Sequence, residues 1–334
     1  MLYEIPSVRH FRAKSVPEAL FWLKEMGGGA RVMAGGTDLL GLLKNRLTEA
    51  EVLVDIKPLP GMSEIAEVGG EGVRIGAGTR LAQLAEAEVI RVKFPLLAQA
   101  AAQVGTTQIR NMGTIGGNLC QRPQCLYFRQ ADFPCRKKGG ARCFAVSGEH
   151  RDYYSILAHG PCVMAHPSDM APALMALGAR AIIAGSGGER ETALEDFFLG
   201  PDQRDETVLN FDELLLAVHV PDPPAPGGQV FLKQRLRRSF DFALVSVAMA
   251  ARISGDVCRE IRIVLGGVAP FPYRGAAAEE VLLGKTLSGP LVAEAAQAAV
   301  QEARPLPMNG YKVDLTRALV ERALKAVWQG CRRS

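Results

Sequence analysis

The sequence has 334 residues, of which 48% are hydrophobic and 22% charged, a composition that excludes a disordered or fibrous chain. The formal net charge is +4 and aromatic residues make up 6%, so we expect neither nucleic-acid binding nor attachment to a membrane surface. No apolar stretch reaches the roughly 18 residues of a transmembrane helix, and Met1–Pro6 lacks the features of a signal peptide. We expect a cytoplasmic protein, or a periplasmic one if it is exported with a signal-bearing partner subunit.

Helices and strands alternate along the chain, which predicts an α+β or α/β fold. The first predicted helix covers residues 16–26, with Ser15 as its N-cap and Pro17 in its first turn. Strands are predicted at residues 30–34, 52–56, 73–77, 181–184, 214–220, 240–253 and 261–268. Further helices are predicted at residues 39–45, from Leu81, and at 95–103, 276–283, 290–303 and 314–329. Residues 221–228, rich in proline and glycine, are the predicted linker.

Two glycine-rich loops could hold a ligand. In the first, the strand residues Val32–Ala34 lead into Gly35-Gly36-Thr37-Asp38, and a helix begins at Leu39. Paired glycines expose backbone N–H groups, which suits a pyrophosphate, although an ordinary strand–turn–helix corner has the same pattern. The second loop runs from Gln108 to Asn118 and contains Gly116-Gly117. Two such loops favour an extended ligand such as a dinucleotide, whereas the alternative is two unrelated turns.

Five of the seven cysteines fall between Cys120 and Cys162. Four of them, Cys125, Cys135, Cys143 and Cys162, have the spacing C-x9-C-x7-C-x18-C within a segment that lacks helical or strand periodicity. An irregular segment of this length needs an anchor, and four thiolates around a metal would provide one. Zinc sites usually contain closely spaced cysteine pairs, so an iron–sulfur cluster fits at least as well. The remaining alternative is a group of free buried cysteines.

The order of these motifs resembles the FAD-binding medium subunit of the molybdenum hydroxylases, the family of xanthine dehydrogenase and carbon monoxide dehydrogenase. The resemblance is carried by Ala34–Leu40 and Thr114–Asn118, and it continues through Ser168–Leu174, Lys233 and Leu265–Ala269. It implies a two-part FAD-binding domain of the PCMH type at residues 1–222, with parts at about 1–57 and 58–222. A C-terminal α/β domain of the CO-dehydrogenase-flavoprotein type would follow at residues 223–334.

The resemblance also implies roles for particular residues toward FAD. The pyrophosphate would be wrapped by Val32, Met33, Ala34, Gly35, Gly36, Thr37, Asp38 and Leu39. The phosphate and ribityl region would be held by Thr114, Ile115, Gly116, Gly117 and Asn118. Asp169 would hydrogen-bond the ribityl chain, and Leu215 and Lys233 would lie near the isoalloxazine or adenine.

Residues 119–164 depart from most of the family. A subset of the family carries a cysteine-rich insert that binds an extra [4Fe–4S] cluster, and this subset includes 4-hydroxybenzoyl-CoA reductase and periplasmic-type aldehyde oxidoreductases. The long Cys143–Cys162 spacing favours the aldehyde oxidoreductase version, with 4-hydroxybenzoyl-CoA reductase as the alternative. We expect Cys125, Cys135, Cys143 and Cys162 to ligate the cluster.

The sequence has no C-x4-C-x2-C motif for a [2Fe–2S] cluster and is too short to include a molybdopterin domain. The expected partners are therefore a large molybdopterin-binding subunit, a small [2Fe–2S] subunit and an external electron donor or acceptor. This chain would relay electrons and would have no catalytic residue of its own. A stand-alone FAD oxidoreductase and a zinc-stabilised module without redox activity remain alternatives.

Overall fold

The computed structural model describes residues 4–223, 227–237 and 240–331, so residues 224–226 of the predicted linker fall outside it. The N-terminal part forms a parallel sheet in the order β1–β3–β2. The elements of this part are β1 (Arg9–Arg12), α1 (Val16–Met26), β2 (Ala30–Met33), α2 (Leu39–Lys44) and β3 (Val52–Asp55). The predicted cap of α1 is confirmed, because the Ser15 hydroxyl accepts a hydrogen bond from the Glu18 N–H at 3.3 Å.

An antiparallel sheet of five strands, in the order β4–β5–β8–β6–β7, forms the middle of the molecule. Its strands are β4 (Ile65–Val68), β5 (Gly72–Gly76), β6 (Arg180–Gly185), β7 (Gly188–Ala193) and β8 (Leu214–Pro221). The helices between them are α3 (Leu81–Glu86), α4 (Glu88–Lys93), α5 (Pro95–Ala102), α6 (Thr107–Met112), α7 (Ile115–Leu119), α8 (Met170–Ala176) and α9 (Leu194–Phe197).

The C-terminal part pairs an antiparallel sheet, β12–β11–β10–β9, with three helices. Its elements are β9 (Gly227–Gln234), β10 (Val245–Ser254), β11 (Val257–Gly266), β12 (Tyr273–Arg274), α10 (Ala276–Leu282), α11 (Gly289–Ala298) and α12 (Tyr311–Cys331). The strand predicted to begin at Phe240 begins at Val245. Phe240 has a left-handed backbone with φ of 73°, and the Asp241 carboxylate accepts a hydrogen bond from the Arg237 N–H at 2.8 Å, so Phe240 and Asp241 lie outside the strand.

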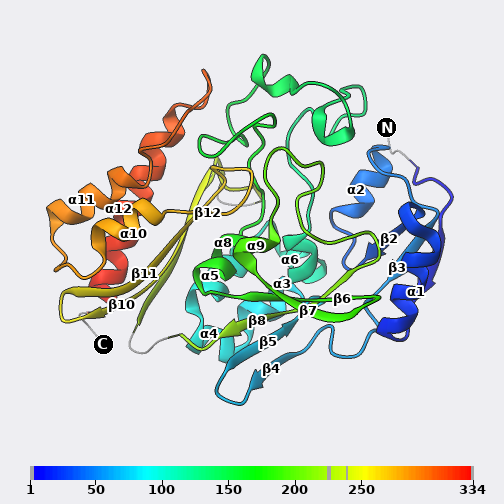
Figure 1. The fold of residues 1–334 in the computed structure, drawn as a ribbon, viewed down its shortest axis with the longest axis horizontal. Helices are drawn as coiled ribbons and strands as arrows, with labels where there is room; N and C mark the ends of the chain where they lie inside the picture. The colour runs from blue at the N-terminus through cyan, green and yellow to red at the C-terminus, as the bar shows by residue number, and fades with distance from the viewer. Residues whose placement is uncertain (1–3, 224–226, 238–239, 332–334) are drawn as a thin grey trace.

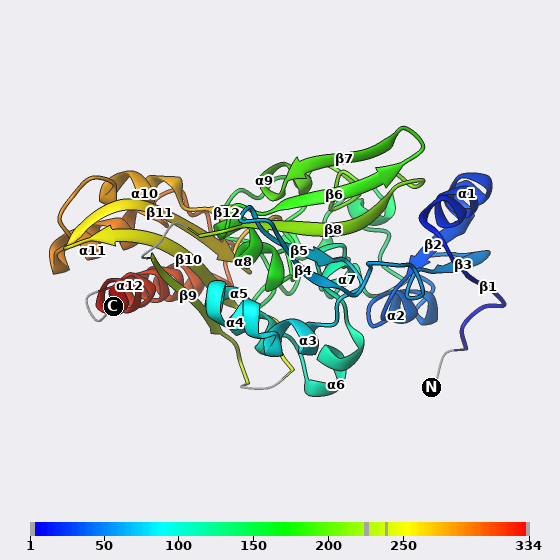
Figure 2. The same ribbon diagram turned by 90° about the horizontal axis from the view of Figure 1, so that it is seen from below.

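The three sheets follow one another along the long axis of the molecule, with the N-terminal sheet at one end and the C-terminal sheet at the other (Figures 1 and 2). Two helices of the central part connect it to the C-terminal sheet: α5 packs against β9, and α8 packs against β11. The irregular segment between α7 and α8 lies along the upper side of the view in Figure 1. This arrangement confirms the predicted mixed fold. Within the described ranges, no helix combines the length and apolarity needed to cross a bilayer.

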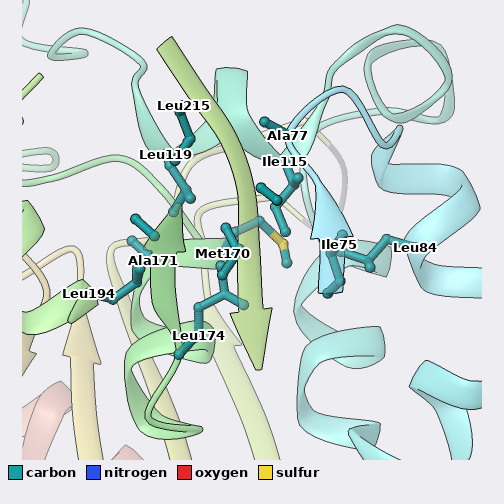
Figure 3. Close-up of a cluster of buried hydrophobic side chains, with 14 of the residues drawn as sticks. Ile75, Ala77, Leu84, Ile115, Leu119, Met170, Ala171, Leu174, Leu194 and Leu215 are labelled. Carbon is teal, nitrogen blue, oxygen red and sulfur yellow. The ribbon is translucent and has the colours of Figure 1, made fainter. Parts of the chain in front are cut away.

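The main hydrophobic core lies beneath the second glycine loop. Ile115 and Leu119 of α7, Met170 and Leu174 of α8, and Ile75 of β5 are buried together in it (Figure 3). Burying such side chains contributes roughly 1.5–3 kcal/mol each relative to leaving them in water. The loops on either side of α7 are therefore held from below by close packing.

Candidate functional site

A cavity of about 600 Å³ opens where the two predicted glycine loops meet. It lies at the junction of β2 and α2 and faces the start of α7 and the beginning of β8. The predicted site residues that line it are Val32, Ala34, Gly35, Gly36, Thr37, Asp38, Leu39, Thr114, Gly116, Gly117 and Leu215. The structure thus brings together loops that are about 80 residues apart in the sequence, and the cavity is in the size range of cofactor sites.

Two glycines allow close packing around the cavity, Gly35 between the two loops and Gly116 between the second loop and the end of β5. A Cβ on Gly35 would lie 1.9 Å from the carbonyl oxygen of Met112, and a Cβ on Gly116 would lie 2.8 Å from the Cβ of Ala77. Thr114 caps α7, because its hydroxyl accepts a hydrogen bond from the Gly117 N–H at 3.1 Å. Gly35 is therefore required by the contact between the two loops, and Gly116 by the contact of the second loop with the end of β5.

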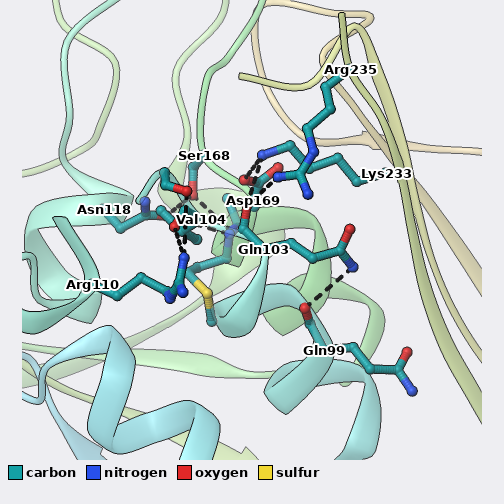
Figure 4. A network of polar contacts seen from close by, with 12 residues as sticks. Gln99, Gln103, Val104, Arg110, Asn118, Ser168, Asp169, Lys233 and Arg235 are labelled. Atoms are coloured by element: carbon teal, nitrogen blue, oxygen red, sulfur yellow. Dashed lines mark hydrogen bonds and ion pairs between the residues drawn. The ribbon is translucent and has the colours of Figure 1, made fainter. Parts of the chain in front are cut away.

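The other five predicted flavin residues do not line this cavity. Met33 and Ile115 alternate with lining neighbours, and Ile115 is fully buried in the main core. Asn118 instead accepts hydrogen bonds on its Oδ1 from the Ser168 hydroxyl at 2.6 Å and the Met170 N–H at 3.4 Å. Asp169 and Lys233 pair with each other beside Asn118 (Figure 4).

The Asp169–Lys233 pair is buried, with 2.6 Å between Asp169 Oδ2 and Lys233 Nζ. Lys233 also donates to the Gln103 carbonyl at 3.1 Å. Burial raises the pKa of Asp169, while the charge of Lys233 opposes that effect. Asp169 Oδ1 has no hydrogen-bond partner among the described residues. A buried acceptor of this kind needs a donor, and a ribityl hydroxyl is a group that could supply one, although Asp169 does not line the cavity between the glycine loops.

Many cavity-lining residues were not predicted. From the N-terminal part they are Arg31, Leu42, Arg46, Leu47, Thr48 and Ile56, and from the central sheet Ala77, Leu209, Glu213 and Leu214. The cysteine-rich segment contributes Cys120, Gln121, Arg122, Phe128, Ala131, Lys137 and Lys138. The dense basic residues of that segment were a usable signal, because a diphosphate carries negative charge.

Cys125, Cys135, Cys143 and Cys162 all line a second, small cavity. They are free thiols within a separate hydrophobic cluster that includes Tyr127, Phe128 and Tyr154. The Cys125 thiol donates to the Tyr154 hydroxyl at 3.6 Å, and burial raises the pKa of Cys125. A hydrogen bond between Cys143 and Cys162 lowers the pKa of Cys143 and raises that of Cys162, and burial raises the pKa of Cys162 further.

The four thiols are not a preformed site for a single metal ion. In the part of the chain that the structure describes, no three His, Cys, Asp or Glu side chains converge closely enough to hold one ion. The four cysteines line one cavity, and the arrangement of the described side chains supports neither a zinc site nor an iron–sulfur cluster by itself.

The two cavities share a wall. Phe128 and Lys137 line both of them, and both side chains are almost fully buried. The Lys137 ammonium lies 3.1 Å from Glu206 Oε1, and Arg122 Nε lies 2.7 Å from the other carboxylate oxygen of Glu206. A buried cation paired with a buried carboxylate therefore stands between the two cavities.

Comparison with known proteins identifies the family. The model described as the FAD binding domain in molybdopterin dehydrogenase matches residues 6–223, and that of the CO dehydrogenase flavoprotein C-terminal domain matches residues 230–327. The chain belongs to the FAD-binding subunits of the molybdenum hydroxylase family. The resemblance read from the glycine loops is thus confirmed at the level of family and of FAD as the cofactor.

Two relatives of this FAD-binding subunit illustrate the similarity. The aldehyde oxidoreductase FAD-binding subunit PaoB of Escherichia coli (strain K12) is 38% identical over 258 residues, covering 76% of this chain and 79% of that protein. The carbon monoxide dehydrogenase medium chain of Hydrogenophaga pseudoflava is 31% identical over 331 residues, covering 98% and 99%. A solved structure of carbon monoxide dehydrogenase from H. pseudoflava superimposes with a TM-score of 0.79 at 29% identity, again covering 98% and 99%.

Proposed function

We propose that this chain is an FAD- and [4Fe–4S]-containing electron-transfer subunit of a heteromeric molybdopterin-dependent oxidoreductase. It would relay electrons between the molybdenum and [2Fe–2S] partner subunits and an external donor or acceptor. FAD exchanges electrons in pairs, whereas iron–sulfur clusters pass them singly. Residues 1–222 would form the FAD-binding domain and residues 223–334 the C-terminal domain.

The observation that carries the proposal is the wall shared by the two cavities. Phe128 and Lys137 separate two cavities: the glycine loops line the first, and the four cysteines line the second. Two redox groups held on either side of one layer of side chains would be close enough to exchange electrons. Neither a zinc-stabilised module nor a stand-alone flavin oxidase would need the four cysteines to lie next to the flavin site.

The spread of the four thiols is compatible with a cluster. A [4Fe–4S] cluster distributes its four cysteine ligands over four iron atoms, so its thiolates lie farther apart than the ligands of one ion. Lys137 and Lys138 border this group, and their charges would offset those of the thiolates. Cys125, Cys135, Cys143 and Cys162 would be the ligands, and no other side chain would be needed.

The substrate would be an aldehyde or an aromatic or heterocyclic compound, transformed on the molybdopterin subunit. The likeness to an aldehyde oxidoreductase subunit favours an aldehyde, and 4-hydroxybenzoyl-CoA reductase is the alternative. Because the relatives are named as an FAD-binding subunit and as a medium chain, the working unit would be a heterotrimer or a doubled heterotrimer. The complex would be cytoplasmic, or periplasmic if a partner carries the export signal.

Anaerobic purification of the complex, followed by analysis of flavin, iron, sulfide and zinc, tests the proposal. We expect one FAD in this chain and, after subtraction of the [2Fe–2S] subunit, about four irons and four sulfides. Cys143→Ser should lose this iron, and Cys258→Ala, a buried cysteine outside the segment, should keep it. Stoichiometric zinc without sulfide would refute the cluster, and absence of FAD would refute the flavin site.

A further inference from the structure

Asp38 belongs to the first glycine loop, yet both of its carboxylate oxygens are engaged by the cysteine-rich segment. Oδ1 accepts from Arg129 Nη2 at 2.7 Å, and Oδ2 accepts from the Arg122 N–H at 2.9 Å. Arg129 also donates to the Arg122 carbonyl at 2.8 Å and to the Pro123 carbonyl at 2.6 Å. Asp38 and Arg129 therefore fasten the start of the segment to the loop.

The negative charge of Asp38 is unexpected at its position in the first glycine loop. Its loop is the proposed pyrophosphate site, and a carboxylate next to a diphosphate would weaken binding by repulsion. The Arg129 guanidinium neutralises that carboxylate at close range. The loop thus carries an acid whose charge is cancelled by a residue more than 90 positions later in the chain.

The segment fastened in this way forms one side of the cavity between the glycine loops, which we propose holds FAD and call the flavin cavity. Arg122, Phe128 and Lys137 line the cavity, whereas Arg129 itself does not. The guanidinium carbons of Arg122 and Arg129 lie 5.2 and 5.8 Å from the centroid of the Phe128 ring. Releasing Arg129 would therefore loosen Phe128 and the basic side chains that face the ligand.

We infer that Asp38 is a positioning residue, which with Arg129 clamps the cysteine-rich segment over the flavin cavity and so couples FAD retention to the order of that segment. The inference rests on the proposed flavin site and does not depend on whether the four cysteines hold a cluster. It assigns to residues 120–138 a role in binding FAD in addition to any role in binding metal. It also predicts reciprocity, since a ligand that needs the ordered segment must stabilise it.

The test is the FAD dissociation constant of the full chain in a double-mutant cycle. Arg129→Gln should weaken FAD binding by about tenfold or more, the size expected for loss of a charge-assisted hydrogen bond. Asp38→Asn should also weaken binding, and the double variant should be no weaker than Arg129→Gln alone. Arg151→Gln is the matched control, because Arg151 lies in the same segment and its guanidinium pairs with Glu149 at 3.8 Å rather than with Asp38.

Each alternative gives a different result. If Asp38 were an unclamped neighbour of the diphosphate, Asp38→Asn would tighten FAD binding, and if it contacted FAD directly, Arg129→Gln would leave the affinity unchanged. Either result would overturn the inference while leaving the flavin site intact, and a wild-type chain without FAD affinity would overturn both. Hydrogen exchange gives a second readout: FAD should protect amides 121–131 in the wild type, and this protection should be lost in Asp38→Asn, a nearly isosteric change.

Discussion

The flavin cavity lies next to the small cavity lined by Cys125, Cys135, Cys143 and Cys162, the cysteine cavity, but the two are formed by different kinds of structure. The flavin cavity lies at the ends of regular elements, where β2 meets α2 and where α7 begins. The cysteine cavity lies in residues 120–164, where two 3₁₀ helices, Arg136–Lys138 and Phe144–Val146, interrupt an irregular chain. Backbone geometry shapes the first cavity, whereas side-chain chemistry shapes the second.

This difference shows which interactions stabilise each of the two sites. The glycine loops rest on the main hydrophobic core through Ile115 and Leu119, so their shape exists without a ligand. The cysteine segment has its own small cluster of aromatic residues and thiols and is fastened to its surroundings by charged side chains such as Arg129 and Lys137. Changes in buried charge should therefore affect the two regions differently.

The largest expected effect distinguishes two buried ion pairs, Asp169–Lys233 beside Asn118 and Glu206–Lys137 between the two cavities. Lys233→Met leaves Asp169 buried without its partner and should cost about 3–5 kcal/mol of unfolding free energy. Lys137→Met should cost less, about 1–3 kcal/mol, because Glu206 keeps Arg122 at 2.7 Å. Chemical denaturation of both flavin-free variants measures the difference. Equal losses would show that Arg122 does not compensate, and the exposed pair of Lys325 and Glu321 supplies the control Lys325→Met.

The next effect tests whether backbone contact shapes the flavin cavity. Gly35→Ala places a Cβ 1.9 Å from the Met112 carbonyl oxygen, which should cost the upper end of the roughly 1–3 kcal/mol typical of overpacking. FAD should be lost at the same time, because the two loops must separate. Gly28→Ala is the control, since nothing lies within 4 Å of the added Cβ. Full flavin content in Gly35→Ala would contradict the account of the loops.

Local signals in the sequence predicted much of the fold and one side of the site. The Ser15 cap, the paired glycines and the apolar runs of β3, β6 and β8 act over a few residues, and the elements they predicted are present. Weakly patterned elements such as β7, with sequence GERETA, and the short helices α7 and α9 were not predicted. Their conformation depends on tertiary packing, which propensity does not record.

The contacts on the other side of the site could not be predicted, because they join residues that are distant in sequence. Asp169 pairs with Lys233, 64 residues later, and Asp38 with Arg129, 91 residues later. Nor does a spacing such as C-x9-C reveal which thiols face a common cavity when the intervening chain is irregular. The family resemblance assigned the glycine loops to FAD but gave no indication that Arg122, Phe128 and Lys137 line the flavin cavity.

A pH effect should mark the place where the cysteine segment returns to the core. His166 is fully buried against Phe198, and burial lowers its pKa to about 3, with a smaller effect of Lys137. The unfolded chain therefore binds the proton more tightly below pH 6.5, and stability falls as the pH falls from about 6.5 toward 3. Between pH 7 and 5 the wild type should lose about 2 kcal/mol more than His166→Gln. Parallel stability curves for the two proteins would contradict this.

The smallest expected effect compares two helix caps, only one of which faces the flavin cavity. The Thr106 hydroxyl accepts from the Ile109 N–H at 3.2 Å, and the Thr114 hydroxyl accepts from the Gly117 N–H at 3.1 Å. Thr106→Ala and Thr114→Ala should each lower the unfolding free energy by about 1 kcal/mol, the usual value of an N-cap. Thr114 lines the cavity and Thr106 does not, so only Thr114→Ala should also weaken FAD binding.

Thermal melting of the flavin-free proteins and fluorescence titration with FAD separate the two effects of these caps. If both variants lose the same FAD affinity, the flavin cavity responds to the stability of the whole α6–α7 region. If only Thr114→Ala loses affinity, the cavity responds to the local conformation of Gly116 and Gly117. We expect the second result, because α7 is anchored in the main core by Ile115 and Leu119, whereas α6 has no buried residue.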